Sequence, residues 1–318
     1  MRQRLVRILI VLSGLLALGL AGLFVFRPSA VMRMMPAPRF EEVVLSGRGA
    51  SGAVIDCGGG WFNDGKVTEI IIRSEKTARG WERPAGITIR DCRIRGSIRI
   101  MGMGRNGEGR EVQRSSVRAG HTQRAQEAAP ARILISGVEI EAHHRIPLYL
   151  APGVTGVVFE KSKLTGWSCS VGIYLDAESA QNVIRDNTFA LWAAREVIAV
   201  DGSAANRIER NCFERIPRGG IYLYRNCGEG GTVRHQTPHA NVIQGNHFAS
   251  RSLGFWCHGI WLGSRNGRRG YCHLDDGYPF GSSLDNRDFA DGNTVVGNVF
   301  SPPTARAIRD EGRDNRVE

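Results

Sequence analysis

A short motif, Asn-x-aliphatic-x-x-Asn-x-Phe, recurs in the second half of the chain. Full copies begin at Asn182, Asn206, Asn241 and Asn293 and end at Phe189, Phe213, Phe248 and Phe300. Weaker copies begin at Ile87, Ile133 and Val157, and the spacings between successive starts are 46, 24, 25, 24, 35 and 52 residues. The base period is therefore about 24 residues, with insertions in the longer units, which is typical of a solenoid.

Each period also holds a short run in which aliphatic residues alternate with others. The runs are Ile98–Ile100, Leu148–Leu150, Ile173–Leu175, Ile198–Val200, Ile221–Leu223 and Ile260–Leu262. Alternation with period two is typical of a strand that buries one face. Three short strands in each coil of about 24 residues, stacked at about 4.8 Å, predict an all-β parallel β-helix over residues 41–318.

The stacking explains the second asparagine of the motif. On successive coils Asn187, Asn211, Asn246 and Asn298 would share one corner, where asparagine tolerates a left-handed backbone and bonds the next asparagine of the stack. We interpret this column as structural and not catalytic.

These repeats resemble the right-handed parallel β-helix proteins of the pectate lyase-like superfamily, from about Val43 onward. The resemblance implies the fold, and it implies a groove over the stack of alternating strands. That superfamily includes lyases, glycoside hydrolases, epimerases of uronate polymers, periplasmic binding factors and adhesins, and the fold does not choose among them.

The N-terminus predicts export. Residues 8–26 carry no charge, follow three arginines within residues 1–7, and are long enough to cross a bilayer core of about 30 Å. The arginines predict a cytoplasmic N-terminus. We expect an uncleaved transmembrane signal anchor at residues 8–26, a linker at 27–40, and a β-helix in the periplasm on the inner membrane; cleavage near Ala37 is the alternative.

Charge and cysteines indicate the kind of partner. The formal net charge is +11 and only four of the 42 basic residues are lysine; arginine grips carboxylates through two bonds. We therefore expect an acidic polysaccharide partner, and no nucleic acid because the domain is exported. The seven cysteines include Cys257 and Cys272, for which a disulfide tying a loop suits the spacing better than zinc. We expect no cofactor; the acidic group at residues 275–291 would suit calcium but matches no loop motif.

The outward positions of the alternating strands predict a binding face. The first outward column reads Arg99, Tyr149, Tyr174, Ala199, Tyr222 and Trp261. Four of these six are aromatic residues that we expect to be exposed and to stack on sugar rings, although aromatic residues also favour strands for their own sake. Insertions at 102–131, 225–240 and 264–292 all follow this strand and would wall the face.

The next outward column predicts the chemistry. It places Asp176 and Asp201 one coil apart, where like charges raise one pKa and create an acid beside a base; two turn-forming aspartates are the alternative. Further candidates for catalysis lie at the edges of the face: Tyr224, Arg225, Arg195, Glu196 and His258.

Three functions remain open at this point. A lyase or C5 epimerase needs a cation for the uronate carboxylate and a base for the neighbouring proton: Arg195 or Arg225 for the first, and His258, Tyr222 or Tyr224 for the second. A hydrolase needs two carboxylates, Asp176 and Asp201, with Glu196 in reserve. A non-catalytic carbohydrate-binding or assembly factor needs neither. The Asp-Pro-His-Asp motif of alginate epimerases and the Arg-x-Pro-x-x-Arg motif of many pectate lyases are absent.

The last residues predict a further partial coil. Asn315 and Val317 fit the first and third places of the motif, 22 residues after Asn293 and Val295. We expect the charged residues around them to discourage edge pairing and to keep the domain monomeric.

Overall fold

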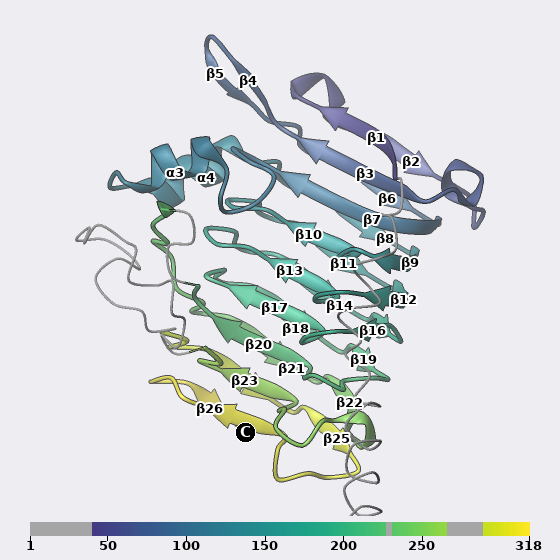
Figure 1. Cartoon of the computed structure of the whole chain (residues 1–318), viewed down its shortest axis with the longest axis vertical. Coiled ribbons are helices and arrows are strands. Elements are labelled where there is room, and N and C mark those ends of the chain that lie inside the picture. Colours follow the sequence, from purple (N-terminus) through teal and green to yellow (C-terminus); the bar gives the residue numbers. More distant parts are fainter. Residues whose placement is uncertain (1–39, 227–230, 266–288) are drawn as a thin grey trace, which may run out of the picture. The chain divides into compact units, whose positions relative to one another are not determined.

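The strands of this protein are short, and each is hydrogen-bonded to its equivalents in the coils before and after it (Figure 1). The computed structural model describes residues 40–226, 231–265 and 289–318. Within them every strand pair is parallel except one hairpin, β4 (Glu75–Thr77) with β5 (Gly80–Glu82). The predicted all-β parallel β-helix is therefore confirmed. The proposed transmembrane segment at residues 8–26 lies outside the described residues, among which no helix is long and apolar enough to cross a membrane.

Three columns of strands form the coils. The first column consists of β1 (Glu41–Ser46), β3 (Thr68–Arg73), the second half of β7 (Arg93–Met101), β10 (Leu148–Leu150), β13 (Ile173–Leu175), β17 (Ile198–Asp201), β20 (Ile221–Tyr224), β23 (Ile260–Leu262) and β26 (Ile308–Asp310). The second column consists of β2 (Val54–Asp56), β6 (Thr88–Arg90), β8 (Leu134–Ser136), β11 (Val158–Glu160), β14 (Val183–Arg185), β18 (Arg207–Glu209), β21 (Val242–Gln244), β24 (Thr294–Val296) and β27 (Arg316–Val317).

The third column carries the phenylalanines of the motif. It consists of the first half of β7, then β9 (Glu139–His144), β12 (Lys163–Ser168), β15 (Thr188–Phe189), β19 (Cys212–Phe213), β22 (His247–Ala249) and β25 (Val299–Ser301), with β16 (Trp192–Ala193) paired to the end of β12. The 3-10 helices η2 (Arg48–Ala50), η3 (Phe62–Gly65) and η5 (Ser250–Ser252) lie between strands.

The interior is a stack of like residues. Phe189, Phe213, Phe248 and Phe300 follow one another with ring centroids 4.7, 4.4 and 4.7 Å apart. Aliphatic side chains from the other two columns fill the rest of the core and are fully buried. Burial of this apolar area, repeated in every coil, stabilises the solenoid.

Two asparagine ladders flank the second column. Asn211 donates through Nδ2 to Asn246 Oδ1 at 2.9 Å and accepts from the backbone N–H of Asn187 at 3.1 Å. The other ladder runs through the first asparagine of the motif: Asn182, Asn206, Asn241, Asn293 and Asn315. The left-handed backbone was misplaced by the sequence prediction, because it falls on the residue before each asparagine, as at Asp186 and Arg210.

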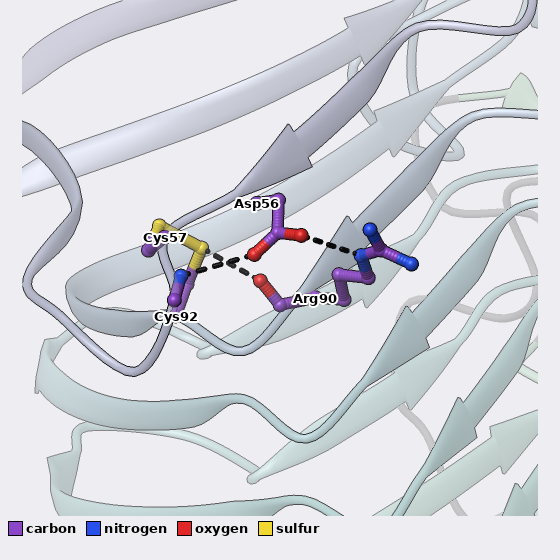
Figure 2. Close-up of a disulfide and its surroundings, with 5 residues drawn as sticks. Asp56, Cys57, Arg90 and Cys92 are labelled. Atoms are coloured by element: carbon purple, nitrogen blue, oxygen red, sulfur yellow. Dashed lines mark hydrogen bonds and ion pairs between the residues drawn. A yellow bond between two sulfur atoms is a disulfide. The ribbon is translucent and has the colours of Figure 1, made fainter.

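The ends of the β-helix also follow the repeat. Arg316 and Val317 pair with Thr294 and Val295, so the partial last coil is confirmed. Near the other end Cys57 and Cys92 form a disulfide beside the Asp56–Arg90 ion pair (Figure 2). Cys257 is a free thiol, so the expected Cys257 disulfide is wrong.

One insertion folds into helices. The residues after β7 form α3 (Arg110–Ser116) and α4 (His121–Ala128), at the edge where the first column ends (Figure 1). Of the other two insertions, residues 225–226, 231–240, 264–265 and 289–292 are described.

Candidate functional site

The first outward column has the predicted register. Tyr149 pairs with Arg99 on one side and Tyr174 on the other, and Tyr222 pairs with Ala199 and Trp261. The column continues to Arg309 in the last coil. Neighbouring rings are in contact: those of Tyr149 and Tyr174 are stacked at 5.3 Å.

The expected exposure of this column is wrong for two of its members. Tyr149 and Tyr222 are each only 7% exposed, while Tyr174 and Trp261 are partly buried. The guanidinium of Arg99 covers the Tyr149 ring at 4.2 Å. Tyr222 belongs to a second apolar cluster, outside the coils, with Val171, Ala199 and Tyr224. The face is therefore covered by its own neighbours and is not an open platform.

Asp176 and Asp201 lie in adjacent coils, as predicted, and both are buried. The pKa of Asp201 is raised from 3.8 to about 7; burial is the main cause, Arg234 opposes the rise and the charge of Asp176 adds to it.

Protein donors occupy the oxygens of both carboxyls. Asp176 accepts from the hydroxyl of Tyr149 at 2.5 Å and from Arg234 at 2.9 Å. Asp201 accepts from the hydroxyl of Tyr174 at 2.6 Å and from both the backbone and side-chain nitrogens of Asn226, at 2.7 and 2.6 Å. In this arrangement the pair fastens the loop after β20 to the face.

Residues 231–237 of that loop close the edge of the face together with α4. Glu178, directly after β13, is fully buried and accepts from the backbone N–H groups of His235 and Gln236 at 2.8 and 3.2 Å. It also accepts from the hydroxyl of Thr122 in α4. Sequence reasoning missed the roles of Glu178 and Arg234, because Arg234 lies in an insertion, where no repeat partner gives its position, and the partners of Glu178 lie in two insertions.

Three candidate residues converge over β17. The hydroxyl of Tyr224 donates to Glu196 Oε1 at 3.0 Å, and Arg195 contacts the same hydroxyl at 3.2 Å and Glu196 at 3.0 Å. Burial, and then the charge of Glu196, raise the pKa of Tyr224 well above its usual value. Glu196 and Tyr224 are buried, whereas Arg195 is partly exposed.

The N-terminal end of the face carries a cationic cluster that the sequence did not reveal. Glu69, on β3, is almost completely buried and is surrounded by Arg99 at 3.5 Å, Arg105 at 2.6 Å and Arg145 at 3.0 Å. One carboxylate among three guanidiniums leaves a local excess of positive charge. Glu69 itself falls outside the recognised repeats, so no pattern pointed to it.

His258 and Trp261 form a more accessible group near the C-terminal end. Their rings lie 5.0 Å apart, and the guanidinium of Arg309 lies over Trp261 at 4.5 Å. Burial, and then the charge of Arg309, lower the pKa of His258. The backbone N–H of His258 donates to the hydroxyl of Tyr222 at 3.0 Å.

The remaining catalytic candidate is Arg225. Arg225 is buried beside the Phe289 ring, at 5.0 Å. No cluster of three metal-ligating side chains occurs in the described stretches of the chain. The acidic group considered for calcium lies mostly in residues 266–288, outside the description.

Comparison with known proteins identifies the fold family. The model of the right-handed β-helix region matches residues 76–237, which is about half of the chain. This protein belongs to the right-handed β-helix family. No curated protein is similar enough to this chain to count as a match.

Two solved structures match this right-handed β-helix protein at low similarity. One is the Dettilon tailspike protein, with 14% identity and a TM-score of 0.29 over 86% of this chain and 60% of the tailspike chain. The other is the A-module of mannuronan C-5 epimerase AlgE6 from Azotobacter vinelandii, with 11% identity and a TM-score of 0.25 over 88% and 83%. This chain therefore spans less than two thirds of the tailspike chain.

Proposed function

We propose that this β-helix protein acts on an acidic polysaccharide by removing the proton beside a uronate carboxylate, as a lyase or C5 epimerase does. The observation that carries the proposal is the group of His258, Trp261 and Arg309 on the face of the last coils. It combines a base and a cation, which such a reaction needs, with an aromatic surface on which a sugar ring can stack.

His258 suits the role of the base. Its lowered pKa keeps the ring neutral at pH 7. The side chain is partly exposed, but its Nδ1 atom is buried, so the other ring nitrogen, Nε2, is the one that would accept a proton from the substrate. A neutral imidazole with one accessible nitrogen can act as a general base.

Arg309 and Trp261 suit the roles of substrate-positioning groups. Arg309 is partly exposed and already pairs with Glu311, so it offers its outer edge to a substrate carboxylate. A charge-assisted bond there would stabilise the negative charge that develops when the neighbouring proton leaves. Trp261 is partly exposed and presents a flat apolar surface to a sugar ring.

The hydrolase alternative rests on Asp176 and Asp201. Both carboxyls are buried and hold protein donors, so the arrangement supports fastening better than attack on a glycosidic bond. Their catalytic role stays a prediction, as do those of Arg195, Glu196, Tyr224 and Arg225.

A non-catalytic acidic-polysaccharide-binding protein is the second candidate function. The same satisfied carboxyls favour it, since a binding factor needs cations and aromatic surfaces but no acid–base pair. The two functions differ in one measurable property, which is covalent change in the sugar.

The test is incubation of the full-length chain with polyuronates in D2O, followed by NMR of the sugar protons and by absorbance of unsaturated uronate. We expect either deuterium at C5 or unsaturated ends with the native chain, and neither with His258→Asn. The matched control is His239→Asn, at an exposed loop histidine. Reducing ends without unsaturation or deuterium would instead favour the hydrolase, and no change with any polyuronate would favour the binding factor.

The pH dependence gives a second test of His258. Because the folded-state pKa is lowered from 6.5, the basic form is present above that lowered value. We expect the rate to rise with pH through a pKa below 6.5 and to be flat near pH 7. A rate that is still rising at pH 8 would assign the base to another group.

The proposal includes export to the periplasm and anchoring in the inner membrane through residues 8–26. Full-length protein should then sediment with membranes and dissolve in detergent. Full-length protein found free in the periplasm would contradict the anchor without affecting the proposed chemistry.

A further inference from the structure

A line of exposed side chains follows the corner where each third-column strand turns into the first-column strand of the next coil. We call this line the corner ridge and define it by Trp167, Trp192, Arg215, Arg218, Phe255 and Trp256. Trp167 and Trp192 are paired in register between β12 and β16, and their ring centroids lie 5.9 Å apart. Trp192 is 38% exposed and Trp167 is partly exposed.

A second aromatic pair lies two coils further along the ridge. Phe255 and Trp256 belong to the longer turn between β22 and β23, and their ring centroids lie 4.7 Å apart. They are 72% and 84% exposed, the highest values among the large hydrophobic residues that the structure describes. Two coils correspond to about 10 Å along the solenoid axis.

Arginines occupy the coil between the two aromatic pairs. Arg215 and Arg218 are exposed, and neither forms an ion pair within the described ranges. The three turns at 190–197, 214–220 and 249–259 hold four arginines and two glutamates. Arginines in and directly after the second column differ, since they pair with acids of the neighbouring coil, as in Arg185–Glu160 and Arg210–Asp186.

We propose that the corner ridge binds one linear chain of acidic polysaccharide along the solenoid axis. The aromatic pairs stack on the apolar faces of sugar rings, and the arginines between them bind the carboxylates of the sugars in the middle. This inference rests on the proposed function for the class of substrate. It moves the main binding surface from the covered first-column face to an open corner.

The order of side chains favours a polysaccharide over a membrane surface. A membrane-binding patch gathers its apolar residues into one area and surrounds them with cations. On the ridge the aromatic pairs are separated by a coil of arginines, so that apolar and charged contacts alternate along a line. A linear polymer with both a ring face and a carboxylate in every unit matches that alternation.

The experiment is native gel electrophoresis of the full-length chain through gels that contain polygalacturonate at increasing concentration. The test variants are Trp192→Ala combined with Trp256→Ala, and Arg215→Ala combined with Arg218→Ala. We expect each double variant to have a Kd for polygalacturonate at least about tenfold higher than that of the native chain, which corresponds to about 1.4 kcal/mol. Dextran in the gel is expected to retard none of the proteins, because it lacks carboxylates.

Matched controls come from similar residues outside the ridge. Trp61 is 44% exposed and lies under Arg95 at 5.2 Å, so Trp61→Ala removes an exposed tryptophan of the same kind. Arg210→Ala removes an exposed arginine that is paired with Asp186. Both controls should bind polygalacturonate like the native chain.

The outcomes separate this inference from the proposed chemistry. Ridge-dependent binding without covalent change to the polymer would support the ridge and overturn the lyase or epimerase. Covalent change with ridge variants that bind normally would overturn the ridge. Polyglutamate or anionic lipid vesicles that bind as well as polygalacturonate, with the same losses in the variants, would also overturn it, because the recognition would then be of charge or of a membrane.

Discussion

Two edges of the coils differ in how their residues repeat: the corner between the second and third columns, and the edge that follows the first-column strands. At the corner between the second and third columns every coil from Asn187 onward repeats the same asparagine, and each amide bonds the next coil at about the same distance. Directly after the first-column strands, and before the asparagine ladder that precedes the second column, the residues differ from coil to coil, and three insertions leave the solenoid there. The difference teaches that repetition marks the scaffold of this protein and that departures from the repeat mark the surfaces that were shaped individually.

The largest loss of stability is expected from a substitution in the asparagine ladder at the repeated corner. Asn211→Ala removes a donor to Asn246 Oδ1 and Ile184 O and an acceptor of two bonds from Asn187. Buried groups left without partners destabilise by about 1–3 kcal/mol each, so we expect a loss of at least about 3 kcal/mol in the free energy of unfolding, measured by urea denaturation. A loss below about 1 kcal/mol would mean that the ladder is not structural. The matched control is Asn226→Ala at the irregular edge, which should reduce stability less.

The second effect concerns pH at the irregular edge. The folded-state pKa of Asp201, raised from 3.8 to about 7, means that the folded chain binds more protons than the unfolded chain between these values. The contribution of Asp201 to stability is therefore present at low pH and is lost as pH rises towards 7.

In the native chain we expect the free energy of unfolding to fall by a few kcal/mol between pH 4 and pH 7, and we expect this fall to be absent in Asp201→Asn. Asp186→Asn is the control, because Arg210 lowers the pKa of this largely exposed carboxyl and its removal should have a small effect of opposite sign. Parallel stability–pH curves for the native chain and Asp201→Asn would contradict the raised pKa.

A smaller effect is expected where the insertions are fastened. Glu178→Gln removes the charge that accepts the N–H groups of His235 and Gln236, and we expect a loss of about 1–3 kcal/mol. Hydrogen exchange should rise in residues 231–237 and in α4 while the strands remain protected. Glu160→Gln, at a partly exposed ion pair with Arg185, should leave exchange in α4 unchanged.

The smallest effect is expected on the corner ridge. Arg218 is exposed and outside the ion pairs of the described residues, so Arg218→Ala should change the free energy of unfolding by less than about 0.5 kcal/mol. A larger change would show that the ridge is part of the scaffold. Thermal unfolding of this variant therefore also tests whether ridge variants lose binding without losing the fold.

The repeat allowed the fold and the register of the first outward column to be predicted, because a 24-residue period fixes which residues stack. It placed Asp176 beside Asp201, and it placed Tyr149, Tyr174, Tyr222 and Trp261 in one column. It did not predict that Tyr149 and Tyr222 are buried. Their cover comes from side chains such as Arg99 and Tyr224, whose long reach across a face leaves no periodic trace in the sequence.

The contacts that close the irregular edge were beyond prediction for a related reason. Arg234 reaches Asp176 across 58 residues of sequence, and Glu178 bonds both α4 and the loop at 235–236. Neither pairing follows from any spacing in the chain. Glu69, which collects three arginines, likewise has no counterpart in the other coils.

In-register stacking makes the length of this protein proportional to its number of coils. Each strand pairs only with its equivalents in the two neighbouring coils, so adding or removing one unit of about 24 residues shifts everything beyond it by about 4.8 Å along the axis and leaves the pattern of strand pairing intact. Duplicating the coil that carries Arg215 and Arg218, for example, would lengthen the stretch between the two aromatic pairs by one step. The number of coils thus sets a length, and the fold provides a way to change that length in fixed increments without designing a new interior.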